Sequence, residues 1–169
     1  SKDVNPELHL IQADCGALPL VDRSQHAVLM ECALSLTMNT NNALSEFQRI
    51  LGADGALIVT DIYIRELAAS ATAGCLSGTH CLAGAMTEAE IREKVLEMGF
   101  TIKIWQDQTV LFKEWMARMV FKLGSLQAFY RQLVSCDKDA EILGMTLGKD
   151  IKLGYYLMIA KKANGNADL

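Results

Sequence analysis

The feature that most constrains the fold is a series of short apolar segments, each ending at an acidic residue. Residues 8–13 lead to Asp14, the segment QHAVLM leads to Glu31, and the segment ALIVT leads to Asp61. The segment ALIVT is continuously apolar and β-branched, which is typical of a strand buried on both faces. We therefore predict strands at residues 8–13, 25–31 and 56–60, with a carboxylate at or near each end.

Helical patterns lie between and after these strands. Residues 43–51 repeat apolar side chains at the spacing of one helical face, follow a possible cap at Asn41 or Asn42, and lead into the turn sequence GADG. Residues 87–98 begin with the capping box TEAE and are followed by Gly99, a helix-ending residue. Both segments are therefore predicted to be helices.

The rest of the chain continues the alternation. Strand patterns occupy residues 101–105 and 154–161, and a long apolar helical pattern over residues 110–134 breaks near Gly124. Strands that alternate with helices predict an α/β domain with a mostly parallel sheet. Ligands of such sheets bind beyond the carboxyl ends of the strands, although an acid at a strand end is commonly no more than a polar exit residue.

Composition excludes several classes of protein. The net charge is −4, which disfavours sequence-independent nucleic-acid binding. No apolar run reaches the roughly 18–20 residues that a membrane span needs. The five cysteines are an odd number scattered among apolar segments, which indicates reduced thiols. We predict a cytoplasmic protein that binds a small molecule and neither nucleic acid nor a membrane.

The order of these motifs resembles the class I S-adenosylmethionine-dependent methyltransferases, in particular those that act on small molecules. Residues 11–20, IQADCGALPL, resemble the third strand of that family and the loop after it. Residues 27–32 resemble the fourth strand. Residues 43–61, ALSEFQRILGADGALIVTD, resemble the next helix, turn and strand, and residues 87–100 resemble the helix before the sixth strand.

The resemblance implies S-adenosylmethionine or S-adenosylhomocysteine as the cofactor and assigns roles to matching positions. Asp14 would accept a hydrogen bond from the adenine amino group, and the backbone N–H of Cys15 would meet a ring nitrogen. The resemblance places Leu18 and Leu34 beside the adenine as apolar walls. It places Met30 and Glu31 beside the methionine part of the cofactor. It implies no metal and no fixed catalytic residue.

The sequence departs from the family in lacking the glycine-rich loop and the acidic residue of the second strand. It resembles the C-terminal two thirds of such an enzyme. We therefore expect a Rossmann-like sheet without its first two strands, with an antiparallel C-terminal strand and a helical insertion before it. Residues 1–163 form one truncated methyltransferase-like domain in this prediction, with the insertion at about 108–148 and a frayed tail at 164–169.

Loss of those strands would leave the fourth strand of the family as an exposed edge, which is a pairing liability. Three outcomes are open. The third strand pairs directly with the fourth, two chains pair as a homodimer, or a missing N-terminal segment completes the sheet. We expect the second or third outcome.

Candidate substrate-binding residues lie in three places. Tyr63 and Arg65 follow the fifth strand of the family, where such enzymes contact their substrates. His80 lies with two cysteines in a Gly/Ala-rich segment, which we interpret as a substrate-covering loop rather than a soft metal site. Trp115 belongs to a wide apolar stripe in the insertion, which is typical of a core-covering helix and also suits a lid over an apolar substrate.

Two functions remain open at this point. In the first, the chain belongs to a methyltransferase that acts on a small molecule, and works within a longer or oligomeric protein. In the second, the chain is a catalytically inactive methyltransferase-fold fragment that serves as a binding or dimerisation module. A third arrangement is a split enzyme whose other half is a separate polypeptide.

Overall fold

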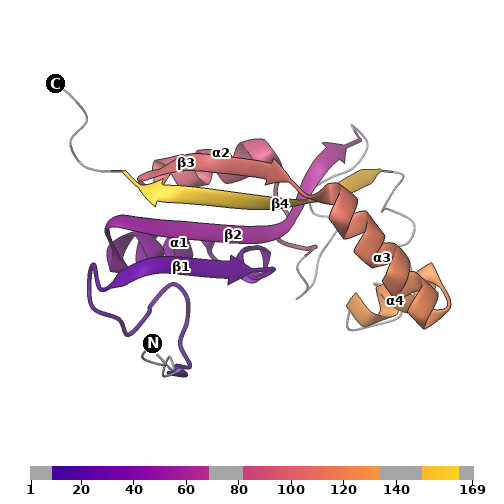
Figure 1. Cartoon of the computed structure of the whole chain (residues 1–169), viewed down its shortest axis with the longest axis horizontal. Coiled ribbons are helices and arrows are strands. Elements are labelled where there is room, and N and C mark those ends of the chain that lie inside the picture. The colour runs from indigo at the N-terminus through magenta and orange to yellow at the C-terminus, as the bar shows by residue number, and fades with distance from the viewer. Residues whose placement is uncertain (1–8, 69–81, 134–149, 164–169) are drawn as a thin grey trace, which may run out of the picture.

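A mixed four-stranded sheet organises the chain in the computed structural model, which describes residues 9–68, 82–133 and 150–163. The strands lie in the order β1-β2-β4-β3, with β1 parallel to β2 and β4 antiparallel to both of its neighbours (Figure 1). The elements are β1 (Gln25–Glu31), a 3₁₀ turn η1 (Leu34–Leu36), α1 (Thr40–Ile50), β2 (Leu51–Leu67), α2 (Glu88–Glu97), β3 (Phe100–Asp107), α3 (Thr109–Leu123), α4 (Leu126–Leu133) and β4 (Ile151–Lys162).

The main core lies between one face of the sheet and the helices α1 and α2. Leu57 and Val59 of β2 and Met158 of β4 are completely buried there. Phe47 of α1 and Val95 of α2 belong to the same cluster, so both helices cover the same side of the sheet (Figure 1). The apolar run at residues 56–60 therefore lies in a central strand, as predicted, but the prediction that both of its faces are buried is wrong, because Ala56, Ile58 and Thr60 on the other face are partly exposed.

The opposite face of the sheet carries a row of apolar side chains without a helical cover among the described elements. Register places Leu29 opposite Ile58, Ile58 opposite Ile159, and Ile159 opposite Ile104. Side chains alternate across a strand, so this row points away from the face that holds Val59. Leu29 is 59% exposed and Ile104 is 41% exposed.

The insertion between β3 and β4 forms a helical pair at one end of the sheet (Figure 1). Gly124 ends α3 in the left-handed conformation, at φ 84°, and α4 follows directly. A second apolar cluster joins the pair to the sheet and contains Ile62, Phe129 and Tyr130. The predicted break near Gly124 is confirmed, and residues 134–148 of the predicted insertion lie outside the described residues. None of the described helices is long and apolar enough to cross a membrane.

Several local predictions are confirmed. The strand β1 has the predicted bounds Gln25–Glu31. The capping box of α2 is complete, because the Thr87 hydroxyl accepts from the Glu90 N–H while the Glu90 carboxylate accepts from the Thr87 N–H. Gly99 follows α2 with φ 78°, a conformation that favours glycine.

Other local predictions are wrong. Residues 9–14 form no strand, and Leu10 and Ile11 are exposed. A strand forms only with a hydrogen-bonding partner, and β1 pairs with β2 alone among the described residues. The cap of α1 is Asn39, whose side chain accepts from the Asn42 N–H, rather than Asn41 or Asn42.

The strand β2 is also longer than predicted. It begins at Leu51, directly after α1. The predicted turn GADG lies within the strand, where the pairing with β1 is irregular. Gly55 is required there because a Cβ atom would lie 2.8 Å from the Leu51 side chain. The strand continues to Leu67, so Asp61 lies inside it and not at its end.

Candidate functional site

The chain segment that precedes β1 runs along α1. The Leu18 N–H donates to the Glu46 carboxylate at 2.9 Å, and the Arg49 guanidinium donates to the carbonyls of Leu18 and Leu20 at 3.0 and 2.8 Å. The Glu46–Arg49 pair that holds this segment is itself joined at 2.8 Å. Hydrogen bonds from Arg49 lower the pKa of Glu46 to about 2, so Glu46 is ionised at neutral pH. We call this Glu46–Arg49 pair the clamp.

This clamp positions a tight turn at Asp14. The Asp14 carboxylate accepts from the Gly16 N–H at 2.7 Å, and the Asp14 carbonyl accepts from the Ala17 N–H at 3.0 Å. Gly16 lies close to α1, because a Cβ atom there would be 3.3 Å from the Asn42 side chain. The other Asp14 carboxylate oxygen has no hydrogen bond within the described part of the chain, so it is available to a ligand.

A cavity of about 470 Å³ opens between this turn and the segment that connects β1 to α1. That volume lies within the range of small-molecule sites. Two exposed apolar side chains, Leu36 and Met38, contribute to its wall. The lining residues are Asp14, Cys15, Gly16, Ala17, Leu36, Thr37, Met38, Asn39 and Asn42.

The residues predicted to bind the cofactor separate into groups. Asp14 and Cys15 line the cavity, and burial together with the Asp14 charge raises the pKa of the Cys15 thiol. The apolar residues that were also predicted to bind the cofactor belong to the main core or pack against it. Glu31 is exposed at the end of β1. The core positions are Leu18, Met30 and Leu34, of which Leu34 is fully buried.

Leu36 and Met38 were not predicted as site residues, and Asn42 was considered only as a helix cap. The segment before α1 has no helical or strand period that distinguishes its exposed side chains from its buried ones. The signal that was available is the pair of apolar residues in an otherwise polar capping segment, LTMNTNN. Exposed apolar side chains beside a cavity are more informative than exposed apolar side chains scattered singly.

A second cavity, of about 360 Å³, lies where the end of β1 meets the insertion. Its wall is largely aromatic. The Phe112 ring stacks on Tyr155 with centroids 5.7 Å apart and on Trp115 with centroids 6.2 Å apart. The lining residues are Cys32, Gln108, Leu111, Phe112, Trp115 and Tyr155. Trp115, a predicted substrate-binding residue, therefore borders a cavity.

The polar side chains of this second cavity are those of Cys32, Gln108 and Tyr155. The Cys32 sulfur lies 3.2 Å from the Tyr155 hydroxyl, and Cys32 has a φ of 48°, which is uncommon for a residue other than glycine. Burial, with a further contribution from the contact with Cys32, raises the pKa of Tyr155 to about 12. The phenol therefore remains protonated at neutral pH and can donate a hydrogen bond.

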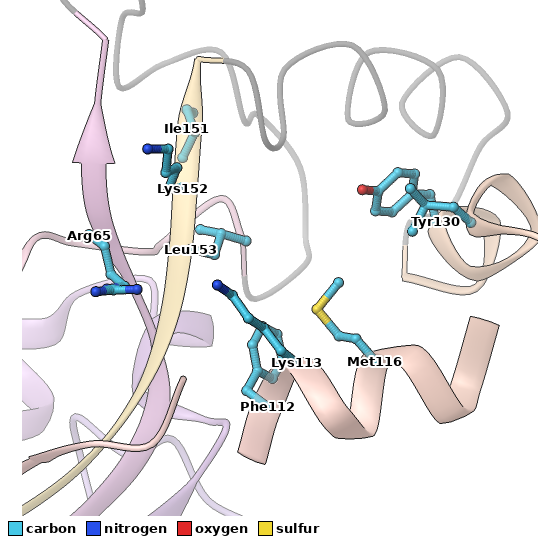
Figure 2. A pocket seen from close by; sticks show the side chains of 9 residues that line it. Arg65, Phe112, Lys113, Met116, Tyr130, Ile151, Lys152 and Leu153 are labelled. Carbon is cyan, nitrogen blue, oxygen red and sulfur yellow. The ribbon is translucent and has the colours of Figure 1, made fainter. Parts of the chain in front are cut away.

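The other predicted substrate residues lie elsewhere. Tyr63 is buried in an aromatic cluster, where its ring meets Trp105 and Tyr156 edge-on at centroid distances of 5.8 and 5.9 Å. Arg65 lies 3.6 Å from Asp107 and borders a third cavity beside the insertion (Figure 2). His80 lies outside the described residues. The structure therefore does not bring Tyr63 and Trp115 to one site.

Asp61 lies inside β2 and has a structural role. Its carboxylate accepts from the Ser35 N–H at 2.8 Å, from the Ser35 hydroxyl at 2.9 Å and from the Ile62 N–H at 2.8 Å. The residue is only 1% exposed, and burial raises its pKa. These bonds attach the turn η1 to β2 and so position the segment that lines the first cavity.

No protein-family model matches the chain. Among solved structures, the chain is similar to the [4+2]-cyclase SpnF, with 22% identity and a TM-score of 0.66 over 90% of this chain and 55% of that one. It is similar to phosphoethanolamine N-methyltransferase 2 of Haemonchus contortus, with 15% identity and a TM-score of 0.65 over 89% of this chain and 36% of that one. A candidate methyltransferase of Bacillus halodurans C-125 aligns with 18% identity and a TM-score of 0.60 over 92% of this chain and 78% of that one.

The chain therefore has the α/β fold of S-adenosylmethionine-dependent methyltransferases. It spans 55% and 36% of the lengths of the first two proteins. The cyclase among them illustrates that one fold supports different reactions, so the reaction must be argued from the site.

Proposed function

We propose that this chain takes part in S-adenosylmethionine-dependent methyl transfer to a small molecule, as part of a longer or oligomeric protein. The observation that supports this most directly is the cavity between the Asp14 turn and residues 36–42, beyond the end of β1. Ligands of parallel sheets bind at such strand ends. The structure of the Haemonchus enzyme is a complex with S-adenosylhomocysteine, which is consistent with the same cofactor here.

The cavity suits the adenosine part of that cofactor. The free carboxylate oxygen of Asp14 would accept from the adenine amino group, and the N–H of Cys15 would meet a ring nitrogen. Leu36 and Met38 would supply the apolar walls, a role that the sequence had suggested for Leu18 and Leu34. Met30 and Glu31, at the end of β1, would lie toward the methionine part.

The aromatic cavity at Cys32 and Tyr155 is the proposed site of the methyl acceptor. Bound S-adenosylmethionine supplies an electrophilic methyl group. Methyl transfer depends mainly on the alignment of the acceptor and the exclusion of water. In this chain, Trp115 and Phe112 would exclude water, and the protonated Tyr155 hydroxyl would orient the acceptor by donating a hydrogen bond. The aromatic wall favours a small, partly apolar acceptor.

The uncovered row of Leu29, Ile58, Ile159 and Ile104 supports the proposal that another segment or another chain covers this face of the sheet. Contiguous exposed apolar surface marks an interaction site. We propose that a second copy, forming a homodimer, or an N-terminal segment covers this face and the free edge of β1. The second apolar cluster, which joins the insertion to the sheet, supports the proposal of one domain over residues 1–163. The free thiols of Cys15 and Cys32 are consistent with the reducing cytoplasm.

The same uncovered row supports the alternative, an inactive fold that serves as a binding or dimerisation module. Calorimetric titration of the folded chain with S-adenosylhomocysteine distinguishes the two. The methyltransferase proposal predicts micromolar binding that Asp14→Ala abolishes. Asp54→Ala, a change to an exposed acid remote from the cavity, should bind as the wild type does. A folded chain that does not bind at millimolar ligand would overturn the proposal for this chain and favour the inactive module.

A further inference from the structure

The third cavity, of about 360 Å³, lies between the helical pair and the outer ends of β2 and β4 (Figure 2). Phe112 borders both this cavity and the proposed acceptor cavity, so the two are neighbours. The floor is apolar and is formed by Phe112 and Met116 of α3 and by Ile151 and Leu153 of β4. It therefore provides a surface for an apolar body.

Three cationic side chains border this apolar floor. They are Arg65, Lys113 and Lys152. Lys152 is paired with Glu66 at 2.6 Å, and Arg65 lies 3.6 Å from Asp107, but neither acid lines the cavity. Lys113 has no ion pair in the described part of the chain. The rim consequently retains a positive charge that is not neutralised, and it contains no acidic side chain among the described residues.

The cavity also contains a buried polar group that has no hydrogen-bond partner among the described residues. Tyr130 is 6% exposed, and its hydroxyl oxygen points across the cavity toward β4 (Figure 2). No described residue hydrogen-bonds to this hydroxyl, and burial is the cause that raises its pKa. Buried hydroxyls are normally hydrogen-bonded, so an unpaired one that faces a cavity indicates a ligand with an acceptor atom.

We propose that this cavity binds a small amphiphilic anion, a carboxylate or phosphate monoester on an apolar body. The anionic group lies between Lys113 and Arg65, the apolar body packs on Phe112 and Met116, and the Tyr130 hydroxyl donates to an oxygen of the ligand. Binding at this site does not require the cofactor, since none of these contacts involves the cofactor cavity, although Phe112 is shared with the proposed acceptor cavity. Its occupancy can be measured without S-adenosylmethionine.

The test is an NMR titration of the full chain labelled at its methionine methyl groups. Met116 lines the cavity, whereas Met158 is completely buried in the main core and serves as the internal control. The probes are octanoate, octyl phosphate, octanol and octylammonium. We expect both anions to shift the Met116 signal and leave Met158 unchanged, octanol to bind roughly tenfold more weakly, and octylammonium not to bind. The stronger of the two anions identifies the headgroup.

Two substitutions complete the test. Lys113→Met keeps the apolar stem and removes the charge, so it should weaken the anions roughly tenfold and leave octanol unchanged. Lys122→Met, on the same helix but outside the cavity, should bind as the wild type does. Equal binding of octanol and octanoate, an unchanged affinity in Lys113→Met, or shifts that miss Met116 would overturn the proposal.

Discussion

Replacement of Asp61 by asparagine tests how the turn η1 is attached to the sheet. The wild-type carboxylate satisfies three donors: the Ser35 N–H, the Ser35 hydroxyl and the Ile62 N–H. An amide has only one acceptor oxygen. If that oxygen keeps the Ser35 hydroxyl and the Ile62 N–H, the amide nitrogen faces the Ser35 N–H, and two donors oppose each other. A buried donor without an acceptor costs about 1–3 kcal/mol, which is the expected loss in the free energy of unfolding.

Urea unfolding of the chain measures this loss. With a typical slope of about 1–3 kcal/mol per molar urea, the midpoint should fall by roughly 1 M. Asp61→Ala leaves both buried N–H groups without an acceptor and should be less stable than Asp61→Asn. The matched control is Asp54→Asn at an exposed position, where the change should stay within about 0.5 kcal/mol. An Asp61→Asn midpoint equal to that of the control would refute the role assigned to this carboxylate.

Three further predictions concern other parts of the molecule. Gly154→Ala places a Cβ atom against the Tyr63 ring and should lower the free energy of unfolding by about 1–3 kcal/mol in thermal melts; an unchanged melting temperature would contradict this. Arg49 lowers the pKa of Glu46 from 4.5 to about 2, so the Glu46 contribution to stability is complete above pH 4.5 and lost as the pH falls through about 2; a carboxyl NMR midpoint near 4.5 would exclude the clamp. The alkaline difference spectrum between wild type and Tyr155→Phe should titrate near pH 12, and a midpoint near 10 would show that the phenol is not buried as described.

Local sequence signals predicted the elements that depend on local bonds. The capping box of α2 joins Thr87 and Glu90, three positions apart, and it is confirmed. The bounds of β1 are also confirmed, although its hydrogen bonds reach the distant strand β2. Residues 8–13 have an equally good strand pattern, yet residues 9–13 form no strand. The pattern shows only that a segment can form a strand. Whether the strand forms depends on a neighbouring strand with an unpaired edge.

The candidate sites were predicted less completely, because their contacts join distant parts of the chain. The approach of Cys32 to Tyr155 spans 123 residues, and no spacing rule brings these two positions together. Asp61 was predicted at a strand end but lies inside β2, and its role depends on the donors of Ser35, which belong to another element. The resemblance to methyltransferases located Asp14 and Cys15, whereas Leu36 and Met38 needed the structure.

We propose that the cofactor binds between the Asp14 turn and residues 36–42. Ultraviolet crosslinking of S-adenosylmethionine labelled at its methyl group, followed by peptide mapping, tests that location directly. We predict that the label lies in peptides containing residues 14–17 or 30–42, and that an excess of unlabelled S-adenosylhomocysteine removes it. Label that concentrates in other peptides, or that persists with the competitor, would contradict the proposed site.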